Sequence, residues 1–73
     1  MNPSSNDIVE YILALIDEFA ETFGLTEHQA YRYIKNHEGI GFIEENYGIF
    51  HTLSFRESVD GLAEFCKRRG GTL

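Results

Sequence analysis

The stretch that decides the fold is IVEYILALIDEFAETFG, residues 8–24. Its apolar residues recur at spacings of three and four, which is the period of an amphipathic helix that buries one face. Its acidic residues fall on the remaining arc, and Gly24 stands where a left-handed residue commonly ends a helix. We therefore predict a helix from about Asp7 to Phe23. The side chains expected to face the core are Ile8, Val9, Ile12, Leu13, Leu15, Ile16, Phe19, Ala20 and Phe23.

The second helix is predicted from about Glu27 to Asn36. Thr26 and Gln29 have the spacing of a capping box, in which the Thr hydroxyl accepts from the backbone N–H of Gln29 and the Gln side chain reaches back to Thr26. The residues expected to face inward are Ala30, Tyr33 and Ile34.

A short third element is predicted from about Ile40 to Phe50. Ile43 and Tyr47 lie on the same face as Ile40, which favours a helix. Gly41 and Gly48 lower the intrinsic helix propensity of this segment, so contacts with other elements must hold it in place.

The fourth helix is predicted from about Phe55 to Arg69. Ser54 and Glu57 form a second capping box at its start. Gly61 lies inside this helix, where glycine costs about 1 kcal/mol relative to alanine, and we expect a close backbone approach to explain it. The apolar stripe of the helix comprises Phe55, Val59, Leu62, Phe65 and Cys66.

The fold class that follows is all-α, a small bundle of three longer helices plus one short helix. No segment alternates polar and apolar residues for long enough to predict a strand. We expect one helical domain over residues 7–70, a flexible N-terminal tail over residues 1–6 and a C-terminal tail over residues 71–73. A chain of 73 residues has length for one domain only.

The charge of the chain limits its partners. Twelve acidic and six basic residues give a formal net charge of −6. Such a domain repels the phosphate backbone of nucleic acids as a whole and is attracted to a basic protein surface. A protein partner is therefore expected, and nucleic acid is disfavoured.

The single cysteine and the lack of long apolar segments indicate a cytoplasmic protein. Cys66 has no second cysteine with which to form a disulfide, which suits a reducing compartment. No apolar run approaches the roughly 20 residues that span a bilayer, so no membrane is involved. The apolar stretch Ile8–Ile16 lacks a preceding Lys or Arg, so it is not expected to be a signal peptide.

The order of the segments resembles a known family. GIGFIEENY at residues 39–47 is followed by Phe50-His51-Thr52, and a last helix through VDGLAEF ends in Lys67-Arg68-Arg69-Gly70. This order resembles a family of small uncharacterised bacterial helical domains that are often encoded beside a toxin-like protein similar to an ADP-ribosyltransferase. The resemblance covers about residues 8–70. It implies an antitoxin-like or accessory partner of such a protein, without catalytic residues.

The most distinctive part of that resemblance is the segment from Tyr47 to Thr52. We take Tyr47, Phe50, His51 and Thr52 as candidate partner-binding residues. The alternative is a structural role, in which the His51 or Thr52 side chain bonds the backbone of the turn and caps a neighbouring helix.

No constellation in the sequence predicts catalysis, a cofactor or a metal. His28, His37 and His51 lack the spacing of a helical zinc site, and Cys66 lies on an expected buried stripe. Neighbouring carboxylates such as Glu44 and Glu45 point about 100° apart on a helix, so they form a solvated face rather than an acid–base pair. We therefore predict that the protein is not an enzyme.

Two alternatives to a protein-binding module remain. Residues 25–43 have the topology of a helix-turn-helix regulator, with a recognition helix containing Phe42 to Asn46, although its charge is unsuited to a DNA groove. A structural homodimer is the other, because ten Phe and Tyr residues exceed what one packed face needs and Tyr is enriched at interfaces.

Overall fold

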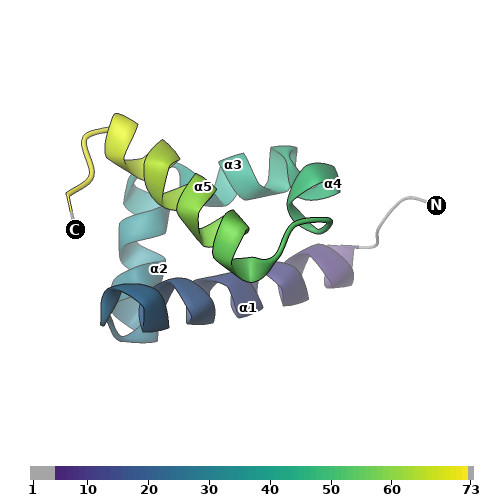
Figure 1. Cartoon of the computed structure of the whole chain (residues 1–73), viewed down its shortest axis with the longest axis horizontal. Helices are drawn as coiled ribbons and strands as arrows, with labels where there is room; N and C mark the ends of the chain where they lie inside the picture. The colour runs from purple at the N-terminus through teal and green to yellow at the C-terminus, as the bar shows by residue number, and fades with distance from the viewer. Residues whose placement is uncertain (1–4, 73) are drawn as a thin grey trace.

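The computed structural model describes residues 5–72, and within that range all regular structure is helical. The all-α prediction is confirmed, with five helices in place of the four expected (Figure 1). The expectations for residues 1–4 and 73 lie outside the described range. The helices are α1 (Ser5–Phe23), α2 (Glu27–Asn36), α3 (Gly39–Glu45), α4 (Tyr47–Phe50) and α5 (Phe55–Arg68).

The helices enclose one core. Figure 1 shows α1 along one side, α2 at its C-terminal end, α3 on the far side, and α5 crossing in front. Helix α1 packs against α2, α3 and α5, while α3 packs against α2, α4 and α5. Short α4 lies at the opposite end from α2, beside the start of α5.

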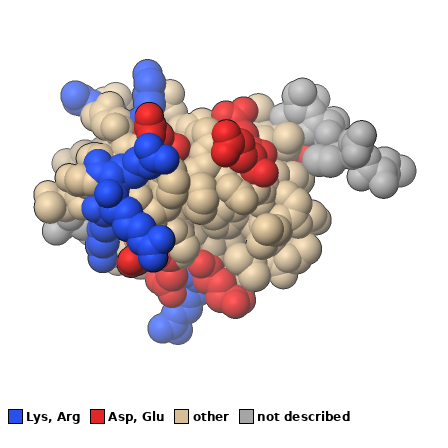
Figure 2. Space-filling model, turned by 90° about the horizontal axis from the view of Figure 1, so that it is seen from above, with Lys and Arg blue, Asp and Glu red and all other residues tan. Residues whose placement is uncertain are grey.

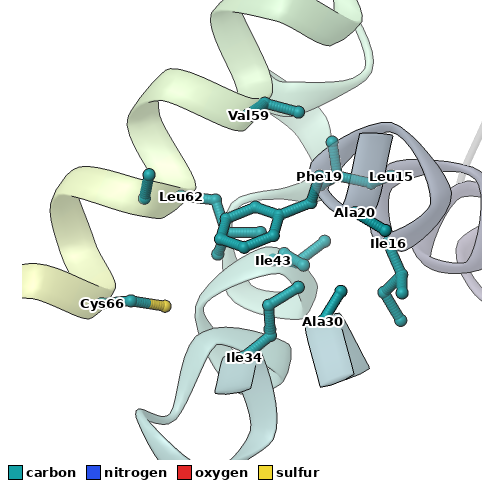
Figure 3. Close-up of a cluster of buried hydrophobic side chains, with 11 residues drawn as sticks. Leu15, Ile16, Phe19, Ala20, Ala30, Ile34, Ile43, Val59, Leu62 and Cys66 are labelled. Carbon is teal, nitrogen blue, oxygen red and sulfur yellow. The ribbon is translucent and has the colours of Figure 1, made fainter. Parts of the chain in front are cut away.

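The core draws on all four longer helices. Phe19 of α1 is fully buried and lies at the centre of the cluster in Figure 3, with Ile43 of α3 and Leu62 of α5. Burying such a side chain stabilises the fold by about 1.5–3 kcal/mol. Cys66 is fully buried in the same cluster, as predicted. The other members are Leu15, Ile16, Ala20, Ala30, Ile34, Val59 and Ala63.

Both predicted capping boxes are confirmed. The hydroxyl of Thr26 accepts from the backbone N–H of Gln29 at 3.1 Å, and the Gln29 side chain accepts from the Thr26 N–H at 2.9 Å. Ser54 and Glu57 repeat the arrangement at the start of α5. Gly24 has φ +66°, the left-handed conformation predicted after α1. Each cap satisfies helix-end groups that would otherwise lack partners.

The predicted third element is divided. Helix α3 ends at Glu45 and α4 begins at Tyr47, with Asn46 between them at φ −115° and ψ 18°. The Asn46 side-chain amide donates to the carbonyl of Phe42 at 2.9 Å. A short amide side chain that bonds nearby backbone competes with the helical ladder, which explains the break.

Helix α1 also begins at Ser5, two residues earlier than predicted.

The expected core face of α1 is too wide. Val9 and Leu13 are 52% and 62% exposed, so the prediction that they face the core is wrong. The reason is the direction of the covering helix, because α2 runs across α1 and not along it (Figure 1). Helix α2 stands at the C-terminal end of α1, where Ile16 and Ala20 of the same stripe are buried (Figure 1).

The close approach predicted at Gly61 occurs elsewhere. A Cβ at Gly61 would meet only the Phe50 ring, at 4.0 Å, so no backbone crosses there. A Cβ at Gly39 would lie 2.6 Å from Ile34 Cγ2 and 3.0 Å from the Ile34 carbonyl oxygen. Gly39 therefore allows the tight joint between α2 and α3. In that joint Glu38 adopts a left-handed φ of 62°.

The end of the described chain also packs on the domain. Gly71 is buried, and its N–H donates to the carbonyl of Cys66 at 3.0 Å. A Cβ at Gly71 would lie 2.5 Å from the hydroxyl oxygen of Tyr33. Residue 71, expected in a tail, thus covers the Tyr33 ring.

Candidate functional site

The segment singled out from the sequence forms α4 and the turn after it, and Phe50 is its anchor. The Phe50 side chain is buried and packs edge-on against Phe42, with ring centroids 5.5 Å apart. The Phe50 carbonyl oxygen lies 3.0 Å from the Tyr11 hydroxyl and 3.3 Å from the Ser58 hydroxyl. Phe50 therefore supports the surface from beneath and offers its side chain to no partner.

Tyr11 and Ser58 hold this anchor through a buried polar triangle. Their two hydroxyls lie 2.9 Å apart, and each also reaches the Phe50 carbonyl. The two hydroxyls and the Phe50 carbonyl thus make three mutual contacts. The hydroxyl of the fully buried Ser58 therefore has hydrogen-bond partners. The triangle ties α1, α4 and α5 together under the candidate site.

His51 and Thr52 bond to their own turn. His51 Nδ1 lies 2.8 Å from the Tyr47 carbonyl oxygen, and Thr52 Oγ1 donates to the Ile49 carbonyl at 2.7 Å. This is the structural role weighed above as the alternative to partner binding. Both side chains are also exposed, so the groups that hold the turn face solvent at the same time.

An aromatic row, defined as Phe55, Tyr11, Tyr47 and His51, runs across this end of the molecule. Tyr11 stacks on Phe55 with centroids 5.8 Å apart and meets Tyr47 edge-on at 5.4 Å. Tyr47 in turn stacks on His51 at 5.0 Å. Such ring pairs contribute about 0.5–1.5 kcal/mol beyond the area they bury. The row joins three helices into one rigid surface.

Large apolar side chains of α4, of the turn after it and of the row itself are exposed. Ile49 is 64% exposed, Phe55 40% and Leu53 37%. We call the aromatic row together with Ile49 and Leu53 the α4 surface. The prediction that Phe55 faces the core is wrong, because it occupies the first position of α5 and its ring lies outside the packed stripe. Sequence reasoning missed Tyr11 and Leu53, since nothing local links residues 11, 47 and 55.

Charge is distributed unevenly around the molecule. Five of the six basic residues lie on α2 or at the C-terminal end of α5, and Figure 2 shows Lys and Arg gathered at that end. The opposite end in the same view, where α4 lies, is largely uncharged. Arg69 pairs with Glu38, and Arg68 pairs with Glu64 at 3.5 Å. The five residues are Arg32, Lys35, Lys67, Arg68 and Arg69.

One pair of carboxylates comes together that the sequence did not predict. Glu27, at the start of α2, has its pKa raised by a hydrogen bond with Asp17 of α1 and then by the negative charge of Asp17. Both side chains are exposed. An acid–base pair for catalysis needs a cleft that sets the two groups apart electrostatically, and this exposed pair lacks one.

Burial makes the thiol and a neighbouring phenol poor acids. Burial raises the pKa of the Cys66 thiol to about 11, so the reactive thiolate is scarce at neutral pH. The pKa of Tyr33 is also raised, by burial and then by Cys66. The Tyr33 hydroxyl has no hydrogen-bond partner within residues 5–72.

The three histidines lie apart from one another in the fold. His28 lies in the first turn of α2, His37 caps the end of α2, and His51 caps α4. In the described part of the chain, no three His, Cys, Asp or Glu side chains are grouped so that they could hold a metal ion. Nor does that part contain a helix with the length and apolar character needed to cross a membrane.

The described residues form a small all-helical domain with exposed aromatic side chains at one end. They include no group of three His, Cys, Asp or Glu side chains that could hold a metal ion. The model of the family described as "Protein of unknown function (DUF3791)" matches residues 7–69, and the chain belongs to this family. No curated protein and no solved structure matches the chain.

Proposed function

We propose that this chain is a non-catalytic module that binds another protein through the α4 surface. The observation that carries the proposal is the exposure of Ile49 and Leu53 together with that of Phe55, whose ring belongs to the row of packed aromatic side chains. Contiguous exposed apolar residues mark interaction sites, and Tyr is enriched among residues that dominate binding energies.

The α4 surface is organised before any partner arrives. Tyr11 is fixed by its hydrogen bonds under the surface, and Tyr47 is held between Tyr11 and His51. Ordering a flexible side chain on binding costs about 0.5–1.5 kcal/mol, so rings that are already fixed bind with less entropy loss.

The partner we propose is an ADP-ribosyltransferase-like protein encoded beside this chain in a bacterial toxin–antitoxin pair. The resemblance of residues 8–70 to domains found in such gene pairs supports this partner. The net charge of −6 supports it too, because a protein that binds a phosphate-bearing cofactor presents a basic surface. The mechanism would be occlusion of that surface, in the cytoplasm, without chemistry by this chain.

The titratable groups support a non-enzymatic role. The Cys66 thiol is buried with a raised pKa, and the Asp17–Glu27 pair is exposed on the outer side of α1 and α2. A nucleophile needs partial exposure and an adjacent base, which Cys66 lacks in the described structure.

Co-purification with the neighbouring gene product tests the proposal. Ile49→Asp should weaken the complex by about 30-fold or more, because a charge placed in an apolar contact removes roughly 2 kcal/mol. Leu13→Asp is the matched control, since Leu13 is 62% exposed and Ile49 64%. Equal losses for the two variants would contradict the assignment of the surface. A toxin that is equally active with and without this chain would contradict the antitoxin role.

A homodimer is the second candidate, and the same exposed residues favour it. Two copies that pair through the α4 surface would cover Ile49 and Phe55. Sedimentation over a concentration series decides the matter, because an Ile49-dependent dimer would identify a second copy as the occupant. A monomer at all concentrations would remove this candidate.

The helix-turn-helix alternative is weakened by the composition of α3. This helix, GIGFIEE, contains no Lys or Arg, and its exposed residues include Glu44 and Glu45. A recognition helix lies between two phosphate strands, which repel such a surface. A gel shift at low salt with DNA from upstream of the gene would revive the alternative.

A further inference from the structure

A groove between α3 and α5 is open to the described surface. Its volume is about 450 Å³, within the roughly 300–1,000 Å³ range of ligand pockets. The lining residues are Glu38, Gly41, Phe42, Glu45, Phe65 and Arg69.

Two of the residues that line the groove are stacked aromatic rings. Phe42 of α3 and Phe65 of α5 lie parallel, with an interplanar angle of 8° and centroids 4.0 Å apart. Both rings are half-buried. Phe42 is braced from beneath by the buried ring of Phe50. Because the two rings cover one face of each other, the groove meets the remaining sides of the stack, which form an aromatic wall.

The Phe65 ring already has a cation over it. The guanidinium carbon of Arg69 lies 4.8 Å from the centroid of Phe65, and the same guanidinium pairs with the Glu38 carboxylate. A cation over an aromatic face, held by a carboxylate, contributes about 0.5–1 kcal/mol at an exposed site. The contact shows that the groove can hold a guanidinium between an aromatic ring and a carboxylate.

The Phe42 side of the groove also has a carboxylate nearby, and no cation among the described residues is paired with it. Glu45 is three residues after Phe42 on α3, so the two side chains lie on one helix face. Glu45 is exposed and has no ion pair among residues 5–72. Gly41 leaves the space beside it open, because a Cβ there would meet nothing within 4 Å.

We propose that this groove binds an arginine or lysine side chain of a protein partner, with the charge at Glu45 and the aliphatic stem on Phe42. Two carboxylates against one guanidinium give the lining a net negative charge, which favours a cation over an anion. The inference rests on the proposed protein-binding function and adds a second contact, on a different face from the α4 surface.

Titration of the intact chain with small probes tests this binding site directly. N-acetylarginine N-methylamide should shift the NMR signals of Gly41, Phe42 and Phe65 saturably. The citrulline analogue, which has nearly the same shape without the charge, should bind about tenfold more weakly, since charge-assisted bonds are about twice as strong as neutral ones. Equal shifts from both probes would overturn the proposal.

Variants separate this site from the α4 surface. Glu45→Gln should weaken arginine binding about tenfold, and Gly41→Leu should abolish it by filling the groove. Gly48→Leu is the matched control, because Gly48 is also helical and also has nothing within 4 Å of an added Cβ. Arginine binding that survives Gly41→Leu would refute the site. Loss of partner binding in Ile49→Asp alone, with arginine binding intact, would leave this inference standing separately.

Discussion

Two helices of this molecule end in the same way, and their surroundings differ. Helix α2 ends with Tyr33 and His37, four residues apart, and α4 ends with Tyr47 and His51. In each pair the His Nδ1 bonds the carbonyl of the Tyr, at 2.7 Å and 2.8 Å respectively. In each pair the two rings also lie together, with centroids 4.6 Å and 5.0 Å apart.

The difference lies in what the tyrosine contacts. Tyr33 packs against the core ring of Phe19, and its hydroxyl is buried without a partner in the described structure. Tyr47 packs against Tyr11 in the aromatic row of the α4 surface, beside exposed Ile49. One pair belongs to the core and the other to the surface.

The Tyr–His spacing therefore ends both helices in the same way, although their surroundings differ. The imidazole satisfies a carbonyl that the helix leaves free, and the ring contact follows from the i, i+4 geometry. The motif alone is therefore no sign of a binding site. The exposure of its neighbours is what distinguishes the α4 surface.

The largest expected difference between the pairs is in packing. Tyr33→Ala should destabilise the protein by about 3 kcal/mol, because it removes a large ring from the core and leaves a cavity. Tyr47→Ala should cost about 1 kcal/mol, since its ring contacts lie at the surface. Urea unfolding followed by circular dichroism measures both values. Similar losses for the two variants would show that the pairs are equivalent in stability.

The core around Tyr33, which includes Cys66, should also respond to alkali. Burial raises the pKa of Cys66 from 9.0 to about 11, so the folded state keeps a proton that the unfolded state releases. Stability is unaffected below about pH 9 and should fall as the pH rises from about 9 to 11, by up to roughly 2–3 kcal/mol. The raised pKa of Tyr33 acts in the same direction.

Urea unfolding at a series of pH values measures this slope. Cys66→Ala should make the dependence shallower, although it also lowers stability at neutral pH. A wild-type stability that does not change between pH 8 and pH 11 would contradict the buried thiol.

The hydroxyls of two tyrosines should have opposite effects on stability. Tyr33→Phe removes a buried hydroxyl without a partner and should stabilise the fold by about 1 kcal/mol. Tyr11→Phe removes bonds to Phe50 and Ser58 and should destabilise it by about 1 kcal/mol. Thermal unfolding of the two variants compares them. A loss in both would indicate that the Tyr33 hydroxyl has a partner.

The smallest expected effect is in the caps. His37→Ala and His51→Ala should each lower stability by about 0.5–1 kcal/mol, the usual net contribution of one hydrogen bond. Equal losses would support the shared local role. A much larger loss at His51 would mean that its surroundings, rather than the cap, determine its contribution.

Local signals in the sequence predicted much of this fold. The Thr26 and Ser54 capping boxes and the left-handed Gly24 depend on residues a few positions apart, and all three were confirmed. The apolar period located α1, α2 and α5 within about two residues of their ends. Period and capping are properties of a single helix, which is why they can be read without the rest of the chain.

The features that were missed depend on neighbouring elements. Val9 and Leu13 have the spacing of core residues, but α2 crosses α1 at its C-terminal end and leaves them uncovered. Phe50 was expected at the surface and is buried, while Phe55 was expected in the core and is exposed. Periodicity shows that a helix has an apolar face; it does not show how far the next helix extends along that face.

The candidate site was located only in part. His51 and Thr52 do lie in an exposed turn, as their residue types suggested, and Tyr47 begins the short helix before that turn. Tyr11 was missing from that set because it is 36 positions away from Tyr47 and meets it only in the folded state. The Asp17–Glu27 pair was missed for the same reason.

The joint between α2 and α3 fixes the rotational phase of the two helices. Only His37 and Glu38 separate them, and Gly39 is pressed against Ile34. Each helical residue advances the chain by about 100°, so inserting a single residue here would turn α3 by that angle. Ile43 would swing out of the core toward the present position of Glu44, and Phe42 would be carried toward the position that Ile43 now occupies. The number of residues between α2 and α3 therefore determines which face of α3 packs into the core of the domain.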